Sequence, residues 1–222
     1  MCQARSVSAR GQLILATTRL LREQSFADLS VAAIAREAQV PVGTVYQRFP
    51  SKQDLLWAAG DRFLQDLELR LCRLRPGSTA APGTVGARET AGRKYTSGLE
   101  VGLLVKCVYG AMAARPGVAI ALLSDTRRDQ LPASLAARLD TFRSRAATLL
   151  DAATLPGDAA GADHLLAVRV ILTQCREEIS LPAAQRSARF TSLLAAAVRA
   201  LLVRAARAPR SRTSGRDRPG RG

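Results

Sequence analysis

The sequence contains few of the residues that build metal sites, disulfide frameworks and catalytic centres. Its 222 residues include four cysteines, at positions 2, 72, 107 and 175, and these lack the paired spacing of a zinc or disulfide motif. The single histidine, His164, cannot complete a zinc site. We therefore expect no metal and no cofactor. We also expect the isolated cysteines to be reduced and to serve as small buried apolar residues.

Long hydrophobic runs are also missing, since no stretch approaches the roughly 18 uninterrupted apolar residues that a membrane helix needs. The first five residues lack the apolar segment and cleavage site of a secretory signal. A nucleophile–base pair, a glycine-rich phosphate loop and a metal cluster are absent as well. These absences predict a cytoplasmic protein that has no membrane contact and is not an enzyme.

Acidic residues are scarce relative to basic ones, with 18 Asp and Glu against 33 Lys and Arg and a formal charge of +15. Such an excess favours a polyanionic partner. It is densest after residue 203, where arginines alternate with Pro and Gly in a composition that cannot bury a core. We predict a disordered Arg-rich tail at 206–222. This tail either adds nonspecific phosphate contacts or is a solvated extension without a role.

Apolar residues are plentiful, at 47% of the chain, and they recur at helical spacing. The pattern predicts an all-α protein with a first helix at about 8–24 and a long helix from Ser51 to Leu74 that starts with a capping box. Residues 76–98 mix Pro, Gly, Ser and Thr and indicate a flexible connection. Beyond it we expect a larger helical region at 99–205, with prolines separating helices at 99–114, 116–128, 133–154, 160–180 and 183–205.

The last two predicted helices carry near-heptad apolar stripes. One stripe comprises Leu165, Val168, Leu172, Cys175 and Ile179, and the other comprises Phe190, Leu194, Ala197 and Leu201. The stripes could pack against each other within one chain. They could equally form a four-helix bundle from two chains, and the pattern does not decide between these arrangements.

Two short helices in succession are predicted at residues 30–49. Ser30 is a suitable N-cap, and an apolar face of Val31, Ile34, Ala35 and Ala38 follows it. After an interruption at 39–41, the same spacing returns with Val42, Val45, Tyr46 and Phe49. Neither helix is long enough to persist alone, so each must pack on the helices before and after it. This arrangement is typical of a helix-turn-helix within a three-helix DNA-binding domain at about 7–67.

The residues in this segment resemble the N-terminal pattern of the tetracycline-repressor (TetR) family of regulators. The resemblance is carried by the runs Ile34-Ala35-Arg36-Glu37-Ala38 and Val42-Gly43-Thr44-Val45-Tyr46-Gln47-Arg48-Phe49, and by Ser51-Lys52-Gln53-Asp54-Leu55. It covers roughly residues 10–65 in order and spacing. It implies that 99–205 is a dimerising domain that binds an effector, although that region holds no motif of its own. Because the region is mostly aliphatic, a pocket there would favour a small, apolar effector.

The resemblance and the physics of groove binding together give a set of expected DNA contacts. Val42, Gly43 and Thr44 are small enough to approach base edges, and the methyl groups of Val42 and Thr44 can touch thymine. In the family, residues at the positions of Tyr46 and Lys52 hold phosphates, and Gln47 and Arg48 are placed to do the same. Ser30 and Ala32 would lie at the DNA edge of the first short helix.

Two positions depart from the family pattern. Gln39 replaces the usual turn glycine, so it either bears strain on the order of 1 kcal/mol or adopts another turn geometry. Pro41 replaces a common capping serine, which removes a side-chain acceptor but supplies a preset φ, so the helix should still form.

The sequence and this resemblance together predict a homodimeric, ligand-responsive regulator that binds a pseudo-palindromic operator in double-stranded DNA. A repressor is the default that the resemblance implies, and an activator would have the same sequence features. The alternative is a sequence-tolerant DNA-compacting protein that uses its basic tail.

Overall fold

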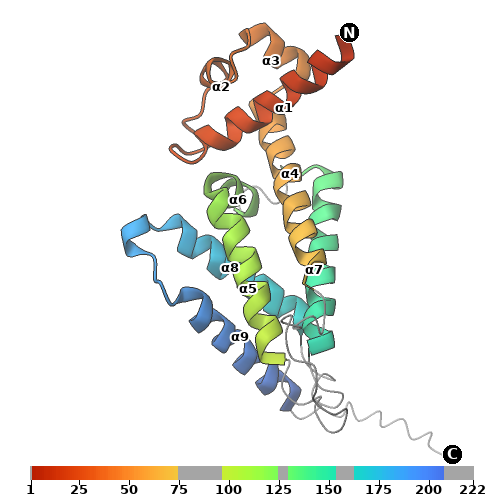
Figure 1. Ribbon diagram of the computed structural model, residues 1–222, viewed down its shortest axis with the longest axis vertical. Coiled ribbons are helices and arrows are strands. Elements are labelled where there is room, and N and C mark those ends of the chain that lie inside the picture. Colours follow the sequence, from red (N-terminus) through yellow and green to blue (C-terminus); the bar gives the residue numbers. More distant parts are fainter. Residues whose placement is uncertain (1, 75–96, 125–129, 154–162, 208–222) are drawn as a thin grey trace, which may run out of the picture.

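The computed structural model describes residues 2–74, 97–124, 130–153 and 163–207, and within these ranges the chain is built from helices with no strand. The expected all-α fold is confirmed. Three helices cluster at one end of the molecule, a larger helical bundle forms the other end, and α4 runs between them (Figure 1). Almost all of the predicted connection at 76–98, and the predicted tail from residue 208 onward, lie outside the described residues.

The N-terminal cluster consists of α1 (Cys2–Leu20), α2 (Val31–Glu37), α3 (Val42–Arg48) and the first turns of α4 (Lys52–Cys72), and we call it the head. Its α1 packs against α4 and α2, and α2 packs against α3. Leu13, Ile34, Val45 and Leu55 bring one apolar face from each helix into a common buried core. The short helices are therefore stabilised by packing rather than by their own length.

Helix α4 starts at a complete capping box. The Ser51 hydroxyl accepts a hydrogen bond from Asp54 N, and the Asp54 carboxylate accepts one from Ser51 N at 2.9 Å. Further along, α4 packs against α6 and α7, where Phe63 and Leu67 are buried. Gly60 allows the close crossing, because a Cβ there would lie 3.0 Å from Leu122 Cδ1. One continuous helix thus links the head to the rest of the molecule.

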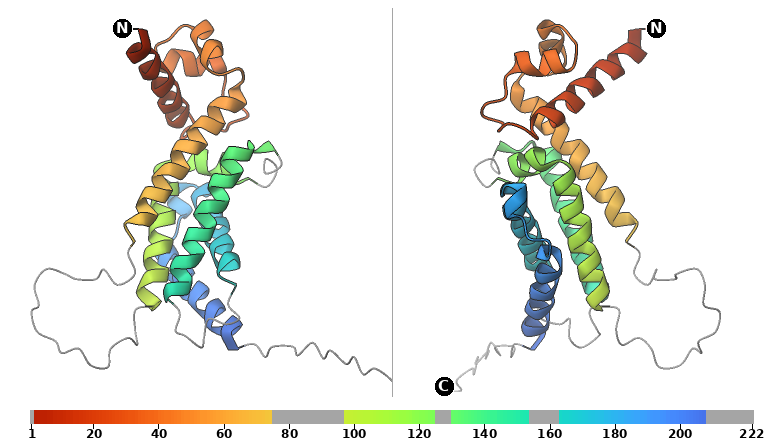
Figure 2. Two further views of the ribbon diagram at one scale, coloured as in Figure 1. Left: turned by 90° about the vertical axis from the view of Figure 1, so that its right-hand side faces the viewer. Right: turned by 60° about the vertical axis from the view of Figure 1, so that its left-hand side comes forward.

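The remaining helices form the body. They are α5 (Ser97–Ala114), α6 (Pro116–Leu123), α7 (Ala133–Ala153), α8 (His164–Ser180), the 3₁₀ turn η2 (Ala183–Gln185) and α9 (Phe190–Arg207). Helix α5 packs against α9, α7 and α8, and α7 packs against α8 (Figure 2). Phe142, Met112 and Ile171 are among the residues buried at these contacts.

Several predicted helix boundaries are wrong. The helix predicted at 116–128 ends at Leu123, and the first helix begins at Cys2 rather than near residue 8. The first helix ends at Leu20 rather than near residue 24, and Arg22 and Glu23 bond back only three residues, to Arg19 and Leu20. The helix predicted at 183–205 starts only at Phe190. Local side-chain bonds hold the preceding segment in a turn, because Arg186 donates to the Ile179 and Leu181 carbonyls and Glu178 accepts from Ser187 N.

The two terminal apolar stripes are only partly buried. On α8, Val168, Leu172, Cys175 and Ile179 are buried as expected, but Leu165 is 51% exposed. Ile171, which is not part of the predicted stripe, is also buried in the core. On α9, Leu194 is buried, but Ala197 is exposed. Each helix therefore has a slightly rotated inward face, because it contacts the rest of the body along a broader surface than one partner helix provides.

The cysteines differ in their exposure. Cys175 is buried, and burial followed by the nearby Glu178 carboxylate raises the pKa of its thiol to about 12. Cys107 is half-buried, and burial also raises the pKa of its thiol. The expectation of burial is wrong for Cys72, which is exposed near the end of α4.

Among the described residues no single helix is both long and apolar enough to cross a membrane. Helices α5 and α6 together have sufficient length and apolar composition, but they meet at an angle of 106°.

Candidate nucleic-acid interface

Helix α2 begins at a side-chain cap. Ser30 has extended backbone angles, and its hydroxyl oxygen accepts a hydrogen bond from Ala33 N at 3.1 Å. Ile34, Ala35 and Ala38 are buried against the rest of the head and Val31 is half-buried, as the periodicity predicts. The Ser30 hydroxyl is exposed, and its own O–H has no acceptor among the residues that the structure describes.

The turn between α2 and α3 closes through a Schellman motif. Val40 N donates to the Ala35 carbonyl at 3.0 Å, and Gln39 N donates to the Arg36 carbonyl at 3.1 Å. Gln39 has a φ of 54°, which is the left-handed conformation that glycine normally supplies. Val40 packs on the core and completes the motif. Of the two alternatives for Gln39, the strained left-handed turn is the one adopted.

Gln39→Gly is expected to raise the free energy of unfolding by about 1 kcal/mol, because glycine takes a left-handed conformation without the Cβ clash. Urea unfolding of both proteins measures the difference. Gln12→Gly, at an exposed helical position of α1, is the control and should lower stability by a similar amount. A Gln39→Gly protein less stable than the parent would show that the side chain of Gln39 stabilises the turn.

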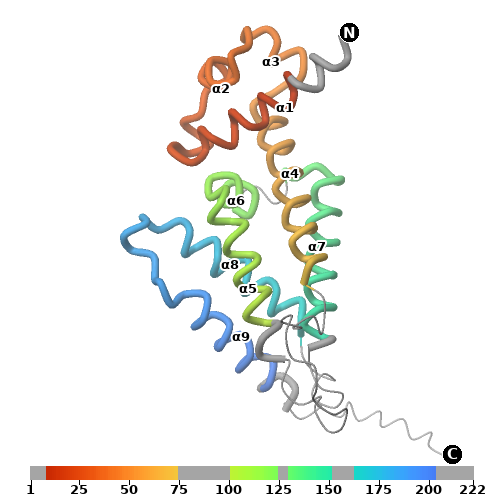
Figure 3. The backbone as a smooth tube through the Cα atoms, viewed as in Figure 1, coloured from red at the N-terminus to blue at the C-terminus, as the bar shows by residue number. Residues whose placement is uncertain are grey.

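Helix α3 forms without a side-chain cap. Pro41 has a φ of −60°, and its carbonyl accepts from Thr44 N at 2.9 Å, so proline provides the first turn as expected. Val45 and Phe49 are 1% and 2% exposed and fix the helix to the head. With this face inward, the opposite face of α3 points to solvent at the end of the molecule farthest from the body (Figure 3).

The exposed face of α3 carries most of the residues predicted to contact DNA. Val42 is 42% exposed and Tyr46 is 55% exposed, and Gln47 and Arg48 are exposed beside them. Gly43 borders open space, since a Cβ there would meet nothing within 4 Å. Thr44 also lies on α3, but it is half-buried. Ala32 is exposed and lies on the neighbouring α2. The fold thus leaves Val42, Gly43, Tyr46, Gln47 and Arg48 exposed on α3.

Lys52 has a structural role that sequence reasoning did not find. Its ammonium group donates to the carbonyls of Phe26, Ala27 and Leu29 at 3.0, 3.2 and 2.8 Å, and it lies 4.8 Å from the centre of the Phe26 ring. Three donors are thus engaged by three acceptors. Lys52 thereby anchors the turn that precedes α2. The phosphate contact expected of Lys52 stays a prediction.

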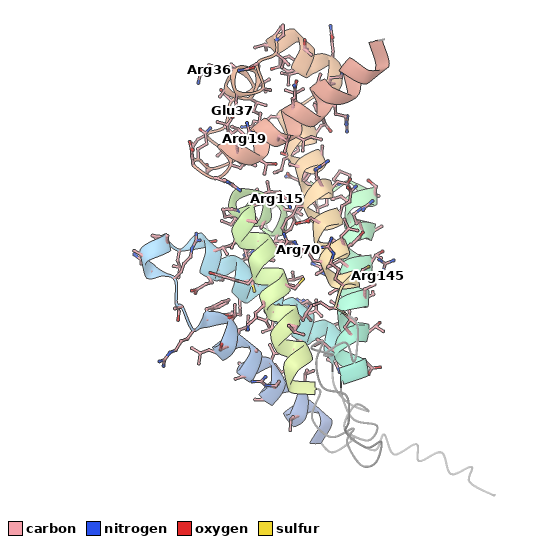
Figure 4. All side chains as sticks on the ribbon, in the orientation of Figure 1. Arg19, Arg36, Glu37, Arg70, Arg115 and Arg145 are labelled. Carbon is pink, nitrogen blue, oxygen red and sulfur yellow. The ribbon has the colours of Figure 1, made fainter. Side chains whose placement is uncertain are left out.

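Arg10 is a further basic residue at this end that the sequence pattern did not single out. Its guanidinium lies over the Phe49 ring, 4.5 Å from the ring centre, and so beside the C-terminus of α3. The contact joins residues far apart in the sequence, and α1 shows no local signal for it. On the other side of α1, Arg19 forms an exposed ion pair with Glu37 of α2 at 3.4 Å (Figure 4).

The head is fixed to the body by backbone contacts around the start of α6. A Cβ on Gly117 would lie 1.7 Å from the Leu21 carbonyl oxygen, so only glycine fits there. Arg22 Nη2 donates to the carbonyl of Ala114, at the end of α5, at 2.8 Å. These contacts hold the turn after α1 directly against α6.

An ion-pair network adds to this junction. Asp66 of α4 accepts hydrogen bonds from Arg70 at 2.9 Å and from Arg115, the N-cap residue of α6, at 3.0 Å. Figure 4 shows both arginines between α4 and the α5–α6 corner. Burial opposes ionisation of Asp66, but the two arginines outweigh it and hold the pKa of the carboxyl below its usual value. The network is therefore charged at neutral pH.

Comparison with known proteins agrees with this geometry. Residues 13–59 match the family described as bacterial regulatory proteins, tetR family. A curated relative, the HTH-type transcriptional regulator HbdR of Aromatoleum sp. (strain CIB), is 37% identical over 70 residues. That match covers 32% of this chain and 31% of the relative, so it spans about a third of each protein.

Solved structures resemble the chain over most of its length. A bacterial regulatory protein of the tetR family from Rhodococcus RHA1 has a TM-score of 0.62 at 12% identity, covering 89% of this chain and 96% of that one. FadR from Bacillus subtilis, solved in complex with stearoyl-CoA, has a TM-score of 0.53 at 21% identity, covering 86% and 96%. These likenesses show the fold of head and body together. The match at 13–59 shows that the head has the N-terminal domain of the tetR family of bacterial regulatory proteins.

Proposed function

We propose that this protein is a sequence-specific DNA-binding regulator of transcription that inserts α3 into the major groove. The observation that carries the proposal is the division of α3 into two faces, with Val45 and Phe49 buried and Val42, Tyr46 and Gln47 exposed at the tip of the head. A short helix fixed in this way can present its early residues to base edges.

Each predicted contact has a chemical role in this proposal. Val42 and Thr44 offer methyl groups to thymine, and the open space at Gly43 allows the backbone to approach the groove. Tyr46, Gln47 and Arg48 bind backbone phosphates. Ser30 and Ala32 lie at the edge of α2, where the Ser30 hydroxyl can donate to a phosphate oxygen. Lys52 supports the same edge by holding the turn before Ser30, and it contacts phosphate if one of its donors becomes free.

The functional unit in this proposal is a homodimer. Helices α8 and α9 pack against each other within the chain, which is one of the two arrangements that the sequence left open for their apolar stripes. A second apolar face stays uncovered on α9, where Leu193 is 63% and Val203 is 49% exposed, with three exposed alanines between them, at 196, 197 and 200. Leu165 and Leu166 of α8 are 51% and 42% exposed. A second copy of the chain would bury these faces in a four-helix bundle.

Two heads held by such a dimer would read an inverted repeat, and repression would follow from blocking the transcription start. FadR from Bacillus subtilis was solved with stearoyl-CoA, which favours a ligand-responsive body in this chain too. An effector changes DNA affinity only if it binds the DNA-competent and incompetent shapes unequally.

Selection of bound sequences from a random DNA pool tests the proposal, and an inverted repeat is the expected result. Arg48→Gln should weaken operator binding and reduce the slope of log affinity against log salt by about 1, as for one lost phosphate contact. Arg145→Gln, at an exposed arginine of α7, is the matched control and should leave the slope unchanged. A featureless selected pool would instead favour the DNA-compacting alternative.

Leu193→Glu is expected to shift the protein from dimer to monomer at micromolar concentration, because the carboxylate would be buried in the paired α8–α9 surface. Sedimentation velocity measures the change. Leu69→Glu replaces a leucine of similar exposure, 62%, on α4 and should leave the dimer intact. A parent protein that sediments as a monomer, or a Leu193→Glu protein that stays dimeric, would refute this interface.

A further inference from the structure

A cleft of about 550 Å³ lies where the head meets the body. One wall is the turn after α1, residues 21–27, and the other walls are α6 and the turn between α8 and η2. Figure 2 shows the turn after α1 lying directly above α6. Because α8 leads into this turn, the cleft borders the head, the body and the helix pair proposed to form the dimer.

The interior of the cleft is mainly apolar. Phe26 of the head and Ile179 of α8 are 8% and 2% exposed, and Ile120 of α6 is half-buried against the core. The volume lies within the range of roughly 300–1,000 Å³ that is typical of small-molecule sites. The cleft can therefore shelter an apolar ligand body of modest size.

Two arginines at the cleft are held in place by backbone carbonyls. Arg186 donates through Nε to the Leu181 carbonyl at 3.0 Å and through Nη2 to the Ile179 carbonyl at 2.8 Å. Arg22 is held by its bond to the Ala114 carbonyl. Among the described residues neither forms an ion pair, although Glu23 also borders the cleft and is exposed. Their guanidinium groups keep further N–H donors for an anion.

We propose that this cleft is the effector site and that it takes a small organic anion with an apolar body, such as a medium-chain carboxylate. The apolar chain lies over Phe26 and Ile120, and the carboxylate accepts hydrogen bonds from Arg186. The proposal rests on the ligand-responsive function above and assigns its site to the junction of head and body. Arg186 is suited to the anion because its carbonyl bonds fix the guanidinium before the ligand arrives.

The position of the cleft couples its occupancy to the DNA-binding surface. Phe26 and Ala27 line the cleft, and their carbonyls also bind the Lys52 ammonium at the start of α4. Three residues after Ala27, Ser30 caps α2. A ligand that presses the head-side wall therefore shifts the anchor of α4 and the start of α2 together. An anion that binds more tightly at one spacing of the walls than at another favours that spacing. It therefore changes DNA affinity by at most the difference between its own affinities for the two spacings.

Calorimetric titration of the full-length protein with decanoate and with decan-1-ol tests the site. We expect decanoate to bind and to weaken DNA binding by about tenfold. Ile120→Trp fills the cleft and should abolish binding of both probes. Arg186→Gln should weaken decanoate at least tenfold and leave decan-1-ol unchanged, whereas mere loosening of the turn would weaken both equally. Arg189→Gln, an exposed arginine outside the cleft, is the control and should affect neither probe.

Two results would overturn the inference. One is the absence of binding by straight-chain carboxylates from hexanoate to dodecanoate, and the other is undiminished decanoate binding by the Ile120→Trp protein. The DNA selection on the same preparations keeps the two proposals apart. A recovered inverted repeat without carboxylate binding removes only the effector site, whereas a featureless pool removes the regulator function itself.

Discussion

Gly117→Val is expected to lower the free energy of unfolding by about 3 kcal/mol, because there is no room for a side chain between α6 and the turn after α1. The added Cβ would lie 1.7 Å from the Leu21 carbonyl oxygen and 2.6 Å from its carbonyl carbon. These are backbone atoms, so no side-chain rotation relieves the overlap, and the head must move away from the body. Urea unfolding monitored by circular dichroism measures the loss.

The same displacement should alter DNA binding, since at Gly117 the backbone of the turn after α1 lies directly against α6. Gly110→Ala is the matched control, because its Cβ would meet nothing within 4 Å and lies at an exposed position of α5. It should raise stability by about 1 kcal/mol through helix propensity. A Gly117→Val protein as stable as the parent, with unchanged operator affinity, would show that head and body are not held together by this contact.

Lys52→Met is expected to cost about 3 kcal/mol of unfolding free energy, since it leaves the carbonyls of Phe26, Ala27 and Leu29 without their shared donor. Methionine keeps most of the apolar stem, so the loss reports on the ammonium group. Two of the three bonds are partly buried, at Phe26 and Leu29, where water replaces the donor poorly. The measurement is again urea unfolding.

Lys106→Met, at an exposed lysine of α5, should change stability by less than about 0.5 kcal/mol and serves as the control. The variant also separates the two roles of Lys52. If Lys52 only contacted phosphate, stability would be unchanged and the salt slope of DNA binding would fall by about 1. The structural role instead predicts a large loss of stability, together with weaker DNA binding as the turn before α2 loosens.

The helix starts and buried faces of the head could be predicted from the sequence, because each depends on residues that are close together in the chain. Ser30 and the capping box at Ser51 mark helix starts by bonds that span three residues. The apolar spacing places Ile34, Val45 and Phe49 in buried faces, whereas Val42 and Tyr46, which share the spacing on α3, are exposed. The sequence left two geometries open for the turn at Gln39, and the structure shows the left-handed one.

The misjudged elements depend on contacts that helical periodicity does not describe. The break before Phe190 is held by Glu178 and Arg186, whose bonds depend on the path of the turn rather than on helical periodicity. The inward faces of α8 and α9 are rotated because several helices share the body core, whereas a heptad stripe assumes one partner.

For this protein, the sequence alone determined the helical class, the position of the helix-turn-helix and the outward set on α3, because local hydrogen bonds and periodic burial define them. The tertiary structure decided how the head is attached. The contact of Gly117 with Leu21, the use of Lys52 as an anchor and the placing of Arg10 over Phe49 each join segments that lie apart in the chain. Such contacts depend on the packing of all helices at once, and the spacing of residues along the chain does not encode them.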